Sequence, residues 1–140
     1  MSSLNHATPD GTARYADRFT SRAAKNHFRL QQGLTLSSIG IGTYLGNPDE
    51  STDVAYANAV TRAVTSGVNV IDTAANYRFQ RSERSIGQAL KTLETEGFSR
   101  EELVICTKGG YLPFDGALPT NMREYVEETF VKPGVASFDD

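Results

Sequence analysis

An apolar run that ends in a carboxylate constrains the fold of this chain more than any other stretch. Residues 68–71 read Val-Asn-Val-Ile, and Asp72 follows them directly. Such a run is typical of a strand buried on both faces, as in a parallel sheet. Because aspartate is depleted in strands and is seldom fully buried without a partner, Asp72 is expected at the strand end, facing a cation.

The best candidate for that cation is Lys108, which ends a second apolar run over residues 103–107. If the two runs form neighbouring parallel strands about 4.8 Å apart, Asp72 and Lys108 emerge side by side at the carboxyl ends. Tyr77, five residues after Asp72, can then reach over both. From spacing alone, a strand-end ion pair with no chemistry is the commoner explanation, and a packing wedge at a barrel rim is the alternative for Tyr77.

The remaining apolar patterns predict strands and helices that alternate along the chain. Glycines and prolines separate these segments, and a short helix over 121–130 follows a long loop. The order indicates βαβ units with right-handed crossovers, and therefore an α/β fold with a parallel sheet. The expected elements are a hairpin over 28–36, strands over 38–43, 68–72 and 103–108, and helices over 48–66 and 82–97.

Three glycines in and just after the first predicted parallel strand resemble the glycines of a dinucleotide-binding loop. Gly40, Gly42 and Gly46 occupy the first, third and seventh positions, whereas the fingerprint needs the first, third and sixth. The acidic residue of that fingerprint lies about 20 residues further on, but Asp72 comes 30 residues after Gly42. A Rossmann site is therefore not favoured.

The amino-terminal segment differs in composition from the rest of the chain. Residues 1–27 are rich in polar and charged side chains and lack a sustained apolar period. This composition predicts a flexible leader over 1–27, followed by one domain over 28–140.

The net charge and the cysteine content limit the kinds of binding partner and the cellular compartment that we expect. The formal net charge of −3, from 14 basic and 17 acidic residues, gives no reason to expect nucleic acid or an anionic membrane as a partner. No apolar run approaches the roughly 18 residues of a membrane span. The single cysteine, Cys106, lies in a predicted buried strand, where it would pack as a small hydrophobe in a reducing compartment. A cytoplasmic protein without metal or P-loop motifs is expected.

Several separated motifs together resemble the aldo-keto reductases in order and spacing. The resemblance implies that the domain over 28–140 is the N-terminal part of a (β/α)8 TIM barrel, with the hairpin closing its bottom. It also implies NADPH as the cofactor and a small aldehyde or ketone as the substrate. The matching motifs are Gly40–Tyr44, Gly67–Ala74 with Tyr77, Ser82-Glu83 with Ile86-Gly87 and Ala89-Leu90, and Thr107-Lys108.

Three members of the family's catalytic tetrad of Asp, Tyr, Lys and His have matching positions, namely Asp72, Tyr77 and Lys108. In the resembled mechanism NADPH delivers hydride to the carbonyl carbon while Tyr77 protonates the oxygen. An ammonium beside a phenol favours the phenolate, and a carboxylate keeps that ammonium charged. The resemblance further places Gly42, Thr43 and Tyr44, together with Asp72, at the nicotinamide end of the cofactor.

The histidine of the tetrad has no matching position. The two histidines, His6 and His27, precede the first predicted strand, and the 36-residue step from Asp72 to Lys108, taken once more, reaches position 144. A complete barrel takes roughly 250 residues. We therefore expect an N-terminal fragment, truncated after about three strands, that lacks most of the NADPH site and is inactive alone. Its exposed sheet edges would favour self-association.

Three hypotheses remain open from the sequence. The first is the N-terminal piece of an NADPH-dependent aldo-keto reductase, which we favour. The second is a non-catalytic binding or regulatory subunit related to these reductases. The third is a stand-alone α/β binding module in which Asp72 and Lys108 are only structural.

Overall fold

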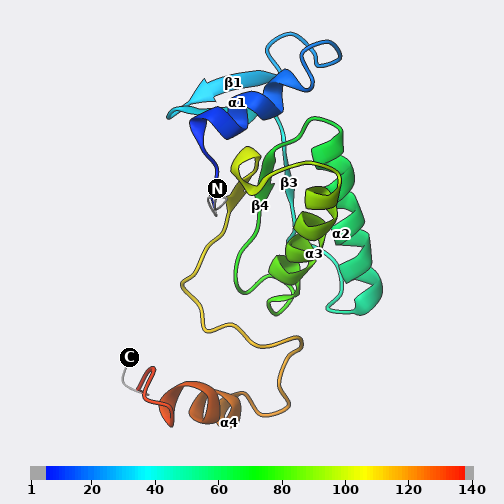
Figure 1. The fold of residues 1–140 in the computed structure, drawn as a ribbon. Coiled ribbons are helices and arrows are strands. Elements are labelled where there is room, and N and C mark those ends of the chain that lie inside the picture. Colours follow the sequence, from blue (N-terminus) through cyan, green and yellow to red (C-terminus); the bar gives the residue numbers. More distant parts are fainter. Residues whose placement is uncertain (1–5, 138–140) are drawn as a thin grey trace.

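The structure, a computed structural model, describes residues 6–137 (Figure 1). Its elements follow the predicted alternation of strands and helices, with one additional helix at the start. In chain order they are α1 (Pro9–Asp17), β1 (Phe28–Gln31), β2 (Leu34–Ser37), β3 (Gly40–Gly42), α2 (Glu50–Thr65), β4 (Val70–Asp72), α3 (Arg81–Thr95), the 3-10 turn η1 (Arg100–Glu102), β5 (Val104–Cys106), α4 (Met122–Val126) and the π-helical turn η2 (Glu127–Val131).

Two separate sheets organise the described residues. Strands β1 and β2 form an antiparallel hairpin, and β3, β4 and β5 form a parallel sheet in that order. Ile41, Ile71 and Ile105 are aligned across the three parallel strands. The predicted mixed α/β fold, its hairpin and its neighbouring parallel strands are confirmed. Over residues 6–137 the parallel sheet is open, and these residues contain no closed barrel.

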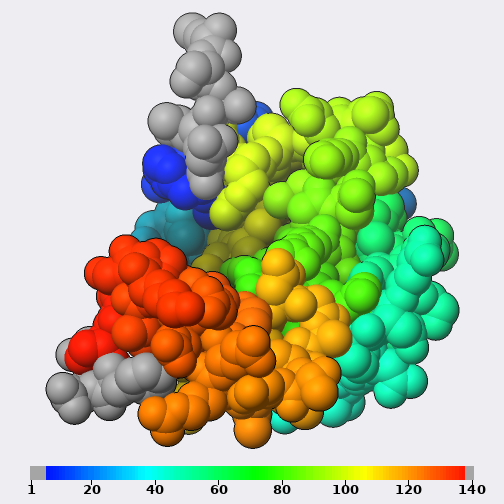
Figure 2. Space-filling view, turned by 90° about the horizontal axis from the view of Figure 1, so that it is seen from below, coloured from blue at the N-terminus to red at the C-terminus, as the bar shows by residue number. Residues whose placement is uncertain are grey.

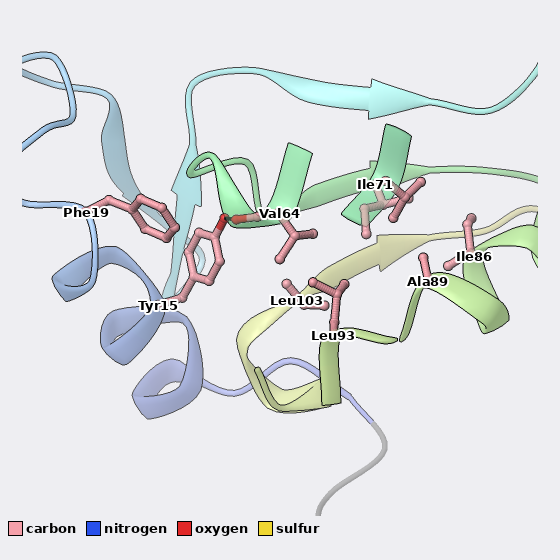
Figure 3. Close-up of a cluster of buried hydrophobic side chains, with 9 residues drawn as sticks. Tyr15, Phe19, Val64, Ile71, Ile86, Ala89, Leu93 and Leu103 are labelled. Atoms are coloured by element: carbon pink, nitrogen blue, oxygen red, sulfur yellow. Dashed lines mark hydrogen bonds between the residues drawn. The ribbon is translucent and has the colours of Figure 1, made fainter. Parts of the chain in front are cut away.

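Helices α2 and α3 cover one face of the parallel sheet and form the main core with it (Figure 3). Alternate residues of a strand face opposite sides of the sheet, and Ile71 faces the side that the helices cover. Its side chain is fully buried. Asp49 caps α2 by accepting a hydrogen bond from the Thr52 N–H at 2.8 Å. The other buried members of the core are Tyr15, Phe19, Val60, Val64, Ile86, Ala89, Leu93 and Leu103.

The opposite face of the sheet carries no helix within residues 6–137 (Figure 1). Val70 and Val104 point to this face and are only partly buried. Cys106 occupies the same face and is exposed as a free thiol, so the expectation of a buried, packed cysteine is wrong. The apolar run predicted the strand correctly, but it carried no information on which of the two faces the helices cover.

The amino-terminal segment is packed against the domain. Thr8 caps α1 by accepting a hydrogen bond from the Gly11 N–H at 3.0 Å. Tyr15 and Phe19 then enter the core, where the Tyr15 hydroxyl donates to the Val64 carbonyl at 2.6 Å (Figure 3). The prediction of a flexible leader is therefore wrong for residues 6–27, while residues 1–5 of that segment lie outside the described residues. These two aromatic side chains, one helical turn apart, dock the segment together with buried Thr12, which accepts a hydrogen bond from the Thr35 N–H, and the ion pair between Arg18 and Glu102.

The Tyr15 phenol predicts how stability responds to alkaline pH. Burial raises the pKa of Tyr15 above its ordinary value of about 10. The unfolded chain therefore loses this proton first, so the contribution of Tyr15 to stability is complete below about pH 10 and is lost as the pH rises further. We expect Tyr15→Phe to cost about 1 kcal/mol at pH 7, through the lost hydrogen bond, and the difference from wild type to shrink above about pH 10. Urea unfolding at several pH values measures it, and a difference that stays constant with pH would contradict it.

The segment after β5 returns to the edge of the sheet at which the parallel strands end (Figure 2). Gly116 N–H donates to the Phe79 carbonyl at 2.9 Å, and the Phe79 and Phe114 rings are 6.3 Å apart. Residues 114–116, in the orange part of the chain, therefore lie against the turn between β4 and α3. Among residues 6–137, no helix has the length and apolar character needed to cross a bilayer.

Candidate active site

The site begins where the parallel strands end. Gly42, Asp72 and Cys106 are aligned at the carboxyl ends of β3, β4 and β5. Backbone hydrogen bonds continue beyond the strands, from Thr73 N–H to the Cys106 carbonyl at 2.8 Å and from Ala75 N–H to the Lys108 carbonyl at 2.9 Å. The residues that follow the strands are therefore held at fixed relative positions.

Asp72 and Lys108 meet at this edge, as the two apolar runs predicted. Lys108 Nζ donates to Asp72 Oδ2 at 2.7 Å and to the Thr73 carbonyl at 2.8 Å. The hydrogen bond to Asp72 raises the pKa of Lys108, and Tyr77 contributes in the same direction. Both side chains are about half exposed, and exposed ion pairs add little stability. The pair therefore keeps a protonated amine in a fixed direction rather than holding the fold together.

Tyr77 lies beside this amine. Its backbone N–H donates to the Ala74 carbonyl at 3.1 Å, within the turn that follows β4. Lys108 Nζ lies 5.2 Å from the centre of the Tyr77 ring, which is within the range of a cation–π contact. The ring also meets Tyr44 edge-on, with ring centres 5.0 Å apart. The structure thus brings Asp72, Lys108 and Tyr77 together.

A pocket of about 250 Å³ opens between the turn after β4 and the turn after β5. Polar groups and an aromatic ring from each turn reach it, so it can hold a small polar molecule next to the amine and the phenol. Its lining residues are Ala74, Ala75, Asn76, Tyr77, Lys108, Gly109 and Tyr111.

Two residues that the sequence did not single out as catalytic or cofactor-binding contact the residues of the site. Ser82 donates its buried hydroxyl to the Thr43 carbonyl at 2.6 Å. Glu83 accepts a hydrogen bond at 2.6 Å from the hydroxyl of Thr107, the residue before Lys108. Both stand in a Ser-Glu pair at the start of α3, a pattern that ordinarily indicates only a helix start.

A comparison with known protein families identifies the family of this chain. The sequence profile of the Aldo/keto reductase family matches residues 38–137. The chain belongs to the aldo/keto reductase family. Over 82 residues it is also 39% identical to the NADH-specific methylglyoxal reductase of Escherichia coli (strain K12). That alignment covers 55% of this chain and 24% of the relative, so the chain spans about a quarter of the relative's length. The resemblance inferred from the separated motifs is confirmed.

Aldo/keto reductases use nicotinamide cofactors, and the three residues after β3 can be tested for such a fit. Gly42 is exposed, and nothing lies within 4 Å of the place where a Cβ would stand, so a flat ring can approach its backbone. Tyr44 is 66% exposed next to it. Thr43 is fully buried and donates its hydroxyl to the Asp72 carbonyl at 3.1 Å. Gly42, Tyr44 and Asp72 therefore fit the nicotinamide end, while the Thr43 side chain supports them from below.

The histidines of the described residues lie away from this site. His27 Nε2 is 2.9 Å from the Gly67 carbonyl and its Nδ1 is 3.0 Å from the Ser38 hydroxyl, near the amino end of β4. His6 is exposed before α1. Residues 6–137 therefore bring three tetrad positions together without a histidine, and they contain no group of three or more side chains arranged to hold a metal ion.

Proposed function

We propose that this chain carries the acid–base part of an NADPH-dependent reductase that converts an aldehyde or ketone to an alcohol. The observation that carries the proposal is the position of Lys108, whose ammonium bonds Asp72 at 2.7 Å and lies 5.2 Å from the Tyr77 ring centre. An ion pair that served only the fold would need neither a phenol beside it nor a pocket in front of it.

In the proposed mechanism each residue has one task. Asp72 keeps Lys108 protonated and aimed. Tyr77 gives its hydroxyl proton to the carbonyl oxygen of the substrate, and the Lys108 ammonium stabilises the negative charge that this leaves on the phenolate. A bound nicotinamide would supply the hydride that the carbonyl carbon accepts. Hydride and proton together give the alcohol.

Two nicotinamide cofactors, NADPH and NADH, are candidates for this site. The family resemblance implies NADPH, whereas the E. coli relative is named as a reductase specific for NADH. The two cofactors differ by one phosphate on the adenosine ribose, far from the nicotinamide. Gly42, Tyr44 and Asp72 would accept the nicotinamide of either cofactor, so both belong in the assay.

The site in these residues is proposed to be incomplete. Residues 6–137 supply no histidine near Tyr77, and their parallel sheet is open. Active sites of (β/α)8 barrels draw on loops from several strands. We therefore propose a partial barrel over 28–140, against which α1 (Pro9–Asp17) packs from outside that range, and very weak reductase activity for the 140-residue chain alone.

A chimera tests this function directly. Residues 38–137, the part matched by the family profile, replace the corresponding residues of the E. coli methylglyoxal reductase. We expect the chimera to oxidise NADH or NADPH when methylglyoxal is added, and the 140-residue chain alone to show little oxidation. Absorbance at the reduced-nicotinamide band measures both.

The outcomes of this assay separate the hypotheses. A folded chimera that oxidises neither cofactor would contradict the proposed chemistry and favour a non-catalytic relative of the reductases. Equal rates for the chain alone and the chimera would contradict the incomplete site. A folded chain that unfolds cooperatively as a monomer, beside an inactive chimera, would favour the stand-alone binding module.

A further inference from the structure

The turn that carries Tyr77 has a backbone that its own sequence does not favour. Arg78, Phe79 and Gln80 have φ angles of 50°, 56° and 68°. These left-handed values are disfavoured for residues with a Cβ, and turns that need them ordinarily use Gly or Asn. Three such residues in succession therefore require contacts from elsewhere in the molecule.

The side chain of Arg78 supplies such contacts. Its guanidinium is buried, with 1% of the side chain exposed. Nε donates to the Asn47 carbonyl at 2.9 Å, and Nη2 donates to the Asp49 carbonyl at 3.3 Å and to Asp53 Oδ1 at 2.6 Å. The guanidinium also stacks above the Tyr56 ring. These partners lie in the loop after β3 and in α2, so Arg78 fastens the left-handed turn to a rigid neighbour.

Asp53 holds the turn from both ends. One of its oxygens accepts from Arg78, and the other pairs with Arg81, the first residue of α3. Arg81 Nε also donates to the Gly116 carbonyl at 2.8 Å. Phe79 and Gln80 are thus bracketed by two arginines that share one carboxylate.

The cost of this arrangement indicates a role in positioning. Nη1 of Arg78 is buried and has no hydrogen-bond partner among the described residues. Buried ion pairs of this kind are weak contributors to net stability, because the desolvation of the charges offsets their attraction. The planar guanidinium of Arg78 binds three acceptors in fixed directions, and this fixes the position of the turn relative to those acceptors.

We propose that Arg78, held by Asp53, is the positioning residue for Tyr77. Arg78 follows Tyr77 directly, so the contacts of Arg78 hold the backbone on the carboxyl side of Tyr77, while the hydrogen bond from the Ala75 N–H to the Lys108 carbonyl holds it on the amino side. With both sides held, the Tyr77 ring lies 5.2 Å from Lys108 Nζ. We call the contacts of Arg78 with Asp53 the clamp. Its role in positioning rests on the proposed function, since the position of the Tyr77 ring matters to the chemistry only if Tyr77 donates the proton.

Fluorine NMR of the whole 140-residue chain labelled with 3-fluorotyrosine tests this role. The chain has six tyrosines, and Tyr77→Phe assigns the Tyr77 resonance. Two variants remove the clamp: Arg78→Gly tolerates the left-handed backbone without the guanidinium, and Asp53→Asn keeps the shape without the charge. Arg84→Gln is the matched control, because Arg84 pairs with Asp115 at the surface, with both side chains more than half exposed.

In both clamp variants we expect the Tyr77 resonance to move toward its position in urea-unfolded protein while the Tyr15 resonance stays in place. Arg84→Gln should move neither, and Arg78→Lys should restore the Tyr77 resonance only in part. An unmoved Tyr77 resonance in folded clamp variants would overturn the proposal. Loss of the Tyr15 resonance in both variants would also overturn it, because Arg78 would then support the whole fold rather than the turn. The measurement involves no carbonyl reduction, so it fails or succeeds independently of the chimera assay.

Discussion

Replacing Tyr77 by Phe in the chimera should lower kcat for methylglyoxal reduction by about 10²–10⁴-fold, the usual contribution of a general acid. The substitution removes one oxygen and keeps the ring that packs on Tyr44 and lies over Lys108. Binding of the substrate should change less than turnover, because the hydroxyl is needed most when the carbonyl oxygen takes up its proton. Steady-state kinetics with saturating cofactor measures the two effects separately.

The matched control for this prediction is Tyr125→Phe. The Tyr125 hydroxyl donates to the Pro113 carbonyl at 3.3 Å, and Tyr125 is not among the residues that line the pocket. Its loss should leave kcat within a factor of about two, since surface substitutions away from a site have small effects. If Tyr77→Phe and Tyr125→Phe behave alike, Tyr77 is not the proton donor, and Asp72 and Lys108 revert to a structural ion pair.

The sequence predicted the parts of the site that depend on strand ends. Parallel strands bring their carboxyl ends to one edge, so two apolar runs ending in Asp72 and near Lys108 were enough to predict their contact. The structure has this pair at 2.7 Å. The alternation of strands and helices could also be predicted, because the spacing of apolar residues differs between a helix and a buried strand.

The sequence did not reveal features that depend on distant partners. Helix α1 and the residues after it pack on Val64 and the core through Tyr15 and Phe19. The sequence of this segment has no sustained apolar repeat from which a packed helix could be predicted. The exposure of Cys106 depends on which face α2 and α3 cover. The left-handed turn at Arg78 lacks the glycine or asparagine by which such turns are ordinarily recognised. In each case the deciding contact comes from residues far away in the sequence.

Leu93→Ala should cost about 3 kcal/mol or more in the free energy of unfolding, as is usual for leucine in a tight core. Leu93 is 1% exposed and lies on α3 among Ile86, Ala89 and Leu103 (Figure 3). Small domains are stable by about 5–15 kcal/mol, so this single change removes a large fraction of the total. Urea unfolding followed by circular dichroism measures the loss, provided that the slope against denaturant stays unchanged.

The control for this stability prediction is Leu118→Ala, which removes the same atoms from a side chain that is 60% exposed. It should change the unfolding free energy by no more than about 0.5 kcal/mol. Equal losses for the two variants would contradict the described core. The expected difference bears on the site as well, because α3 begins with Arg81 and Ser82, which bind Asp53 and the Thr43 carbonyl. A loosened α3 should therefore disturb the turn that holds Tyr77 before the protein unfolds as a whole.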